Sequence, residues 1–170
     1  MDCLLRRRRT TYGLMRLVYW RARTADVPRV LGDRVPAALL RGAIAGVIAS
    51  LVALAWLHFA PAPTPPATRV LDSELAGLAI IAIAAAPVFE EFIFRGLIFQ
   101  GLRRSFGLAA ATLASAAIFA LVHPVHAMVP VFVMGALAAL VYERTKMLAA
   151  PMTVHAIYNA VVVGWQWNAI

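Results

Sequence analysis

Cysteine and charge are both scarce in this sequence. The 170 residues include a single cysteine, Cys3, which excludes an internal disulfide and a metal site built on several cysteines. Charged residues make up 14% of the chain, and the stretch from Ser105 to Tyr142 contains no Asp, Glu, Lys or Arg. The sequence also lacks H-E-x-x-H, the pattern in which two histidines of one helix hold zinc, and it shows no internal repeat.

Apolar residues take the place of the missing charge. They make up 62% of the chain, and the mean hydropathy is +0.79, whereas a soluble domain is about 45–50% apolar. About 20 apolar residues span a bilayer as a helix. We therefore predict an all-α, polytopic transmembrane helix bundle of about five spans. The expected spans are residues 36–60, 75–102 with a kink at Pro87, 105–123, about 130–143 and 147–170.

Basic residues gather before the first span. Ten of the sixteen lysines and arginines precede position 42, which predicts two parts: a basic arm over residues 1–35 and a helical bundle over 36–170. A basic arm on a membrane protein favours anionic lipid headgroups as its partner over nucleic acid, and a cytoplasmic N-terminus. We expect no cleaved signal peptide, and Trp165 and Trp167 are expected to anchor the last span at the interface.

Three charges interrupt the apolar stretch "VFEEFIFRGLIFQG", residues 88 to 101. Glu91 and Arg95 are four residues apart, with the acid first, which is the favourable order for a helical ion pair. Glu90 points about 100° away from Glu91 on a helix, so the arginine is expected to satisfy Glu91 and to leave Glu90 facing elsewhere. Ionisable groups inside spans are by default candidates for function, although helix pinning is the simpler alternative.

Polar residues on two later spans are the predicted partners of these carboxylates. His123 follows Phe119 by four residues, and Asn159 follows His155 by four, so each pair shares a helix face. In lipid, such groups turn inward toward one another. His126, beside the turn, and His58, at the end of the first span, are less favoured.

The order E-E-x-x-x-R, F-x-x-x-H, H-x-x-x-N over about residues 75–165 resembles the CPBP family. These are the CAAX protease and bacteriocin-processing (Abi) intramembrane proteases, and this chain is similar to a short member. The resemblance implies catalytic roles for Glu90 as general base, His123 beside it, and His155 with Asn159 as stabilisers of the oxyanion. Glu91 and Arg95 are implied to be supporting residues.

The resemblance also carries expectations about cofactor, substrate and location. No tightly bound metal is favoured, with zinc held by Glu90, His123 and His155 as the alternative. The substrate is expected to be a membrane-associated peptide or protein, either prenylated or bacteriocin-like, and the location the bacterial cytoplasmic membrane.

Two other functions remain open from the sequence. One is a non-enzymatic membrane scaffold or bacteriocin self-immunity protein, in which the polar cluster only holds helices together. The other is a proton-linked transporter, because intramembrane Glu and His also relay protons.

Overall fold

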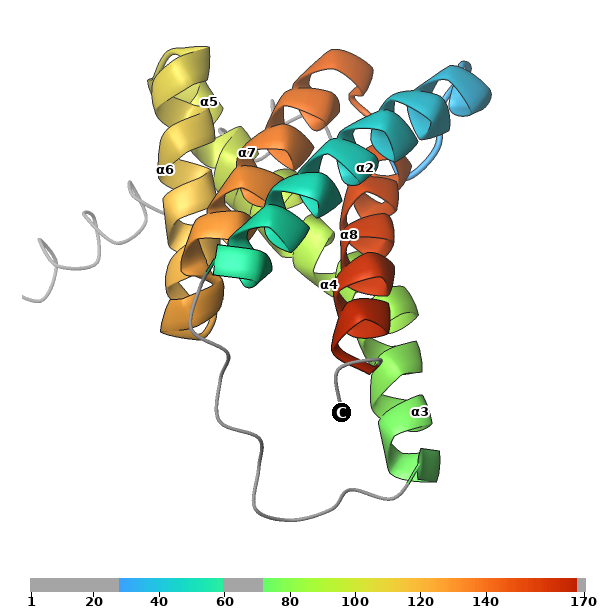
Figure 1. The fold of residues 1–170 in the computed structure, drawn as a ribbon. Helices are drawn as coiled ribbons and strands as arrows, with labels where there is room; N and C mark the ends of the chain where they lie inside the picture. The colour runs from blue at the N-terminus through green and yellow to red at the C-terminus, as the bar shows by residue number, and fades with distance from the viewer. Residues whose placement is uncertain (1–27, 60–71, 168–170) are drawn as a thin grey trace, which may run out of the picture.

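The computed structural model describes residues 28–59 and 72–167, and these ranges are helical apart from short connections. Glu90 and Glu91 lie on one continuous helical stretch. In chain order it consists of α3 Asp72–Ile80, the π-helix η1 Ile81–Ala85, α4 Ala86–Glu91, the π-helix η2 Phe92–Phe99 and α5 Gln100–Ser105. The others are α2 Val35–Phe59, α6 Leu108–Leu121, the 3-10 turn η3 Val125–Ala127, α7 Met128–Thr145 and α8 Ala149–Trp167. The predicted all-α bundle is confirmed (Figure 1).

The predicted spans correspond to helices of unequal length. In the described ranges, three segments are long and apolar enough to cross a membrane: Val35–Phe59, Ala76–Ser105 and Val125–Thr145. α6 has 14 residues and would rise only about 21 Å, short of the roughly 30 Å hydrocarbon core. α8 has 19 residues and does not meet the same criterion of length and hydropathy. Residues 28–59 and 72–167 contain five helical segments, and the number that cross the bilayer stays a prediction.

Small residues allow α2 to lie against α8. The buried face of α2 consists of Ala38, Gly42, Ala45, Gly46, Ala49, Ser50 and Ala53. A Cβ atom added to Gly42 would lie 2.5 Å from the carbonyl oxygen of Ala150, and one added to Gly46 would lie 3.0 Å from that of Val154. At Gly42 only glycine permits this approach, and at Gly46 any larger residue would be tightly packed; small residues at helix contacts are common in membrane proteins. Figure 1 shows α2 crossing in front of α7 and α8.

Backbone hydrogen bonds connect α7, α8 and the segment before α2 at one end of the bundle. Lys146 ends α7 in the left-handed conformation, with φ at 53°. The amides of Leu148 and Ala149, at the start of α8, donate to the carbonyls of Arg29 and Val30 at 2.8 and 3.0 Å. The first amides of a helix lack partners within it, so these bonds cap α8 and bring the start of α2 to the same end.

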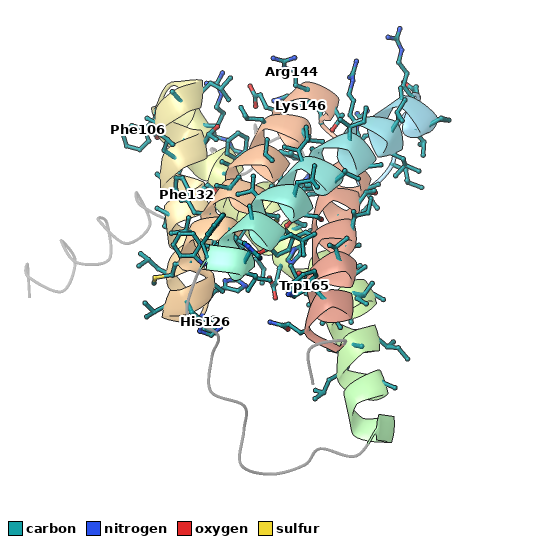
Figure 2. All side chains as sticks on the ribbon, viewed as in Figure 1. Phe106, His126, Phe132, Arg144, Lys146 and Trp165 are labelled. Carbon is teal, nitrogen blue, oxygen red and sulfur yellow. The ribbon has the colours of Figure 1, made fainter. Side chains whose placement is uncertain are left out.

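The same end is rich in basic side chains. Glu143 accepts from Arg103 at 3.1 Å and from Lys146 at 2.6 Å, which joins the ends of α5 and α7. Arg144 and Lys146 lie at the opposite end of the bundle from His126 (Figure 2). Three parts of the chain lie outside the described residues: residues 1–27 of the predicted basic arm, residues 60–71, and the side chain of Trp167. Trp165 is exposed at the end of α8.

Candidate active site

A fully buried ion pair lies at the centre of the bundle. The Glu91 and Arg95 side chains are both 0% exposed, and Arg95 Nη1 donates to Glu91 Oε1 at 2.9 Å. Arg95 Nη2 donates to the carbonyl oxygen of Gly135 in α7, also at 2.9 Å. The guanidinium carbon lies 4.8 Å from the centre of the Phe119 ring, so α6 contributes its aromatic face. The predicted pairing is therefore present, and Arg95 also connects η2 to α7.

His155 lies between the two glutamates. Its Nδ1 lies 3.0 Å from Glu91 Oε1, and its Nε2 lies 3.9 Å from Glu90 Oε2. Glu91 Oε1 already accepts from Arg95, and a carboxylate oxygen only accepts, so Nδ1 is the donor. This bond places a proton on Nδ1 and directs Nε2 toward Glu90. Glu90 therefore does face away from Arg95, as predicted, and the group it faces is His155.

Phe119 separates and contacts the two histidines. Its ring centre lies 4.7 Å from that of His123 and 5.6 Å from that of His155, and the ring is fully buried. His123 Nδ1 lies 2.8 Å from the carbonyl oxygen of Phe119, which can only accept, so Nδ1 donates. Nε2 of a neutral His123 is then an acceptor without a proton.

Asn159 is held by backbone rather than by the other site residues. Its Nδ2 donates to the carbonyl oxygen of Ala82, in η1, at 2.7 Å. It shares the inward face of α8 with His155, as the spacing predicted. The partner of Asn159 was not predictable from the sequence, because a backbone carbonyl becomes available only through the local helix geometry.

Several polar atoms of the site lack protein partners. Among the described side chains, Glu90 Oε2, Glu91 Oε2 and Arg95 Nε are buried without a hydrogen bond. Buried polar atoms without partners are unusual in native proteins and mark positions where water or substrate can bind. The Glu90 side chain as a whole is 34% exposed, so one carboxylate combines a buried oxygen with access from outside.

The predicted metal ligands do not gather into a metal site. Within residues 28–59 and 72–167, no three His, Cys, Asp or Glu side chains come together in a way that could hold a metal ion. Glu90, His123 and His155 thus do not fit zinc as arranged here. Zinc stays an alternative prediction, and no step below depends on it.

The less favoured histidines lie away from the glutamates. The His58 side chain is exposed at the end of α2, against the Phe59 ring. The His126 side chain is exposed in η3, and its backbone oxygen accepts from Trp56 Nε1 at 2.8 Å.

Comparison with known proteins agrees with the arrangement of these motifs. The family model described as type II CAAX prenyl endopeptidase Rce1-like matches residues 72–161, more than half of the chain. The chain belongs to this family. It is 39% identical over 87 residues to the membrane-embedded CAAX protease MroQ of Staphylococcus aureus, covering 47% of this chain and 35% of MroQ. It is 33% identical over 92 residues to YdiL of Bacillus subtilis, named provisionally as a membrane peptidase, covering 54% of this chain and 38% of YdiL.

The matched region contains all six predicted site residues, from Glu90 to Asn159. The chain spans little more than a third of the length of these two relatives. No solved structure matches the chain. Together with its long apolar helices, membership of this family indicates an integral membrane protein.

Proposed function

We propose that this chain is an intramembrane endopeptidase that hydrolyses a peptide bond of a membrane-associated substrate, with Glu90 as general base. The observation that carries the proposal is the 3.9 Å separation between Glu90 Oε2 and His155 Nε2. This distance is too long for a direct hydrogen bond, and one water can bond to both atoms. Glu90 Oε2 is buried without a protein partner, so such a water would also satisfy it.

The first step forms a nucleophile from that water. Glu90 takes one proton as the water oxygen attacks the carbonyl carbon of the substrate, and the carbonyl π electrons move to its oxygen. His123 is the second acceptor proposed for orienting the water, since its Nδ1 proton is engaged by the Phe119 carbonyl and its Nε2 is free. A positioned base of this kind typically contributes a factor of about 10²–10⁴.

The second requirement is stabilisation of the oxyanion. In its imidazolium form, with a proton on each ring nitrogen from the start, His155 donates through Nε2 first to the water oxygen and then to the oxyanion, and the Glu91 carboxylate at Nδ1 stabilises that imidazolium. Asn159 has a second Nδ2 hydrogen beyond the one bound to Ala82, and this hydrogen is the proposed partner donor. Collapse of the intermediate breaks the C–N bond, and protonated Glu90 returns its proton to the leaving amine.

The proposed substrate follows from the family and from the membrane location. A peptide whose cleaved bond lies close to a prenylated cysteine would be held at the bilayer by its lipid, and a bacteriocin-like peptide would be held by its own apolar residues. We propose the cytoplasmic membrane as the location, with the basic end of the bundle facing the cytoplasm. Exposed Arg29, Arg34, Arg104 and Arg144 at that end would meet anionic headgroups.

The test is cleavage of defined peptides by the purified protein in lipid vesicles. A farnesylated peptide ending in a CAAX sequence, the same peptide without the lipid, and a bacteriocin-like peptide form three parallel assays. Glu90→Gln keeps the side-chain shape and should lower kcat at least about a hundredfold. Glu143→Gln is the matched control, because this glutamate lies at the basic end, away from the proposed general base. Since no general base is lost, kcat of this variant should stay within about twofold of the parent. Equal activity of the Glu90→Gln variant and the parent would support the scaffold alternative instead.

A further inference from the structure

The carbonyl oxygen of Ala82 has neither the backbone donor of an α-helix nor that of a π-helix. In an α-helix its donor would be the amide of Ala86, four residues later. Here the Ala86 amide donates to Ile81 instead, because η1 has the wider π pattern. In that pattern the donor for Ala82 would be the amide of residue 87, five residues later, and Pro87 has no N–H.

Asn159 supplies the donor that Pro87 lacks. Its Nδ2 lies 2.7 Å from the Ala82 oxygen, across the contact between α8 and η1. A carbonyl left without a donor inside a membrane is costly, because no water is available to replace it. The bond also lies close to the candidate active site. Asn159 is one helical turn from His155, and Pro87 is three residues before Glu90.

We infer that Pro87 and Asn159 act as one positioning device, in which the proline frees a carbonyl and the asparagine binds it. The bond fixes α8 against the helical stretch that carries Glu90 and Glu91, and so fixes the 3.9 Å gap between Glu90 and His155. This positioning role is separate from the donation to the oxyanion proposed above. Its consequence for catalysis rests on the proposed function, whereas its consequence for stability does not.

The test is a double-mutant cycle between the two positions. Asn159→Ala leaves the Ala82 carbonyl without a donor and should lower the Tm by roughly 2–12 °C. Pro87→Ala restores a backbone amide, so in that background Asn159→Ala should lower the Tm by less than about 2 °C. Asn159→Asp keeps the side-chain shape but has no N–H, and it should lose as much as Asn159→Ala. Pro130→Ala is the control: Pro130 lies in the first turn of α7, the carbonyl four residues before it, that of His126, accepts from Trp56 and not from Asn159, and this change should therefore not alter the effect of Asn159→Ala.

Kinetics of the parent, the two single variants and the Pro87→Ala/Asn159→Ala double variant test positioning beyond folding. Asn159→Ala should lower kcat with little change in KM, and the Pro87→Ala/Asn159→Ala double variant should recover kcat at least about tenfold over Asn159→Ala alone, because positioning is restored and only the oxyanion donor is still missing. Equal Tm losses from Asn159→Ala in both backgrounds would overturn the inference. If Asn159→Ala does not fold, recovery of folded protein in the double variant supports the inference, and failure of the double variant beside a folded Pro87→Ala overturns it. If the effects of Pro87→Ala and Asn159→Ala on the Tm are coupled but neither the parent nor any variant cleaves the peptide, the positioning role is supported and the proposed protease function is rejected.

Discussion

Replacement of Arg95 by methionine tests what holds the centre of the bundle together. The change removes the donor of Glu91 Oε1 at 2.9 Å, the bond to the Gly135 carbonyl and the cation over the Phe119 ring. Methionine keeps much of the volume, so the main effect is a buried carboxylate that has lost its counter-charge. Breaking a buried pair by removing one partner typically costs about 3–5 kcal/mol.

The structure places the expected loss in the lower part of that range. His155 Nδ1 still donates to the same Glu91 oxygen, and the Gly135 carbonyl lies within α7 and keeps its place in the helical hydrogen-bond pattern. We therefore expect a loss of about 3 kcal/mol, or a Tm lower by roughly 6–12 °C for a chain of this size. Thermal unfolding in detergent, followed by tryptophan fluorescence, measures it.

A surface pair gives the matched control. Arg103 and Glu143 are joined at 3.1 Å, but their side chains are 37% and 19% exposed. Arg103→Met should then cost only about 0–1 kcal/mol. A Glu91→Gln/Arg95→Met double variant should unfold at a higher temperature than Arg95→Met, because it removes the stranded charge as well. If Arg95→Met is as stable as Arg103→Met, or the double variant is no more stable than Arg95→Met, Arg95 does not neutralise Glu91.

Three further predictions concern packing, the histidines and topology. Gly42→Leu should lower the Tm by several degrees, because overpacking typically costs about 1–3 kcal/mol and the first added carbon would meet α8, whereas Gly77→Leu, with open space at its Cβ, should not. His123→Ala should reduce peptide cleavage at least about tenfold more than His126→Ala, since only His123 contacts the site; equal losses would contradict the assignment. Reporter fusions after Arg104 and Ile170 should report opposite sides of the membrane, and both on one side would reject five spans.

The helices and the main ion pair could be predicted from the sequence because both depend on neighbours along the chain. Apolar runs and their breaks placed the helical segments, and the third predicted span, expected to end near His123, ends as a helix at Leu121. The spacing of Glu91 and Arg95 predicted their contact, since residues four apart lie on one helix face. The G-x-x-x-G spacing of Gly42 and Gly46 was also present in the sequence as a signal for close packing, although none of the expectations drawn from the sequence alone used it.

The contacts of His155 and Asn159 depend on how α8 is rotated and shifted relative to α4, which no spacing along the chain determines. The i, i+4 relation shows that these two residues share a face, but not which groups that face meets. The π-helices add a second difficulty, because they change which carbonyls are free. The sequence predicted only a kink at Pro87. Proline has no backbone N–H, and this was the clue that it would also leave a carbonyl without a donor.

The buried charges are better explained by what they do to His155 than by stability. A buried ion pair is often no more stabilising than apolar side chains of the same size, so helix pinning alone does not account for Glu91 and Arg95. Arg95 donates to Glu91 Oε1, the same oxygen accepts the proton of His155 Nδ1, and Nε2 is thereby directed at Glu90 across 3.9 Å. Each step fixes the next group, and the series ends at a carboxylate oxygen without a protein partner. An arrangement that served only to join helices would have no reason to leave that last oxygen free.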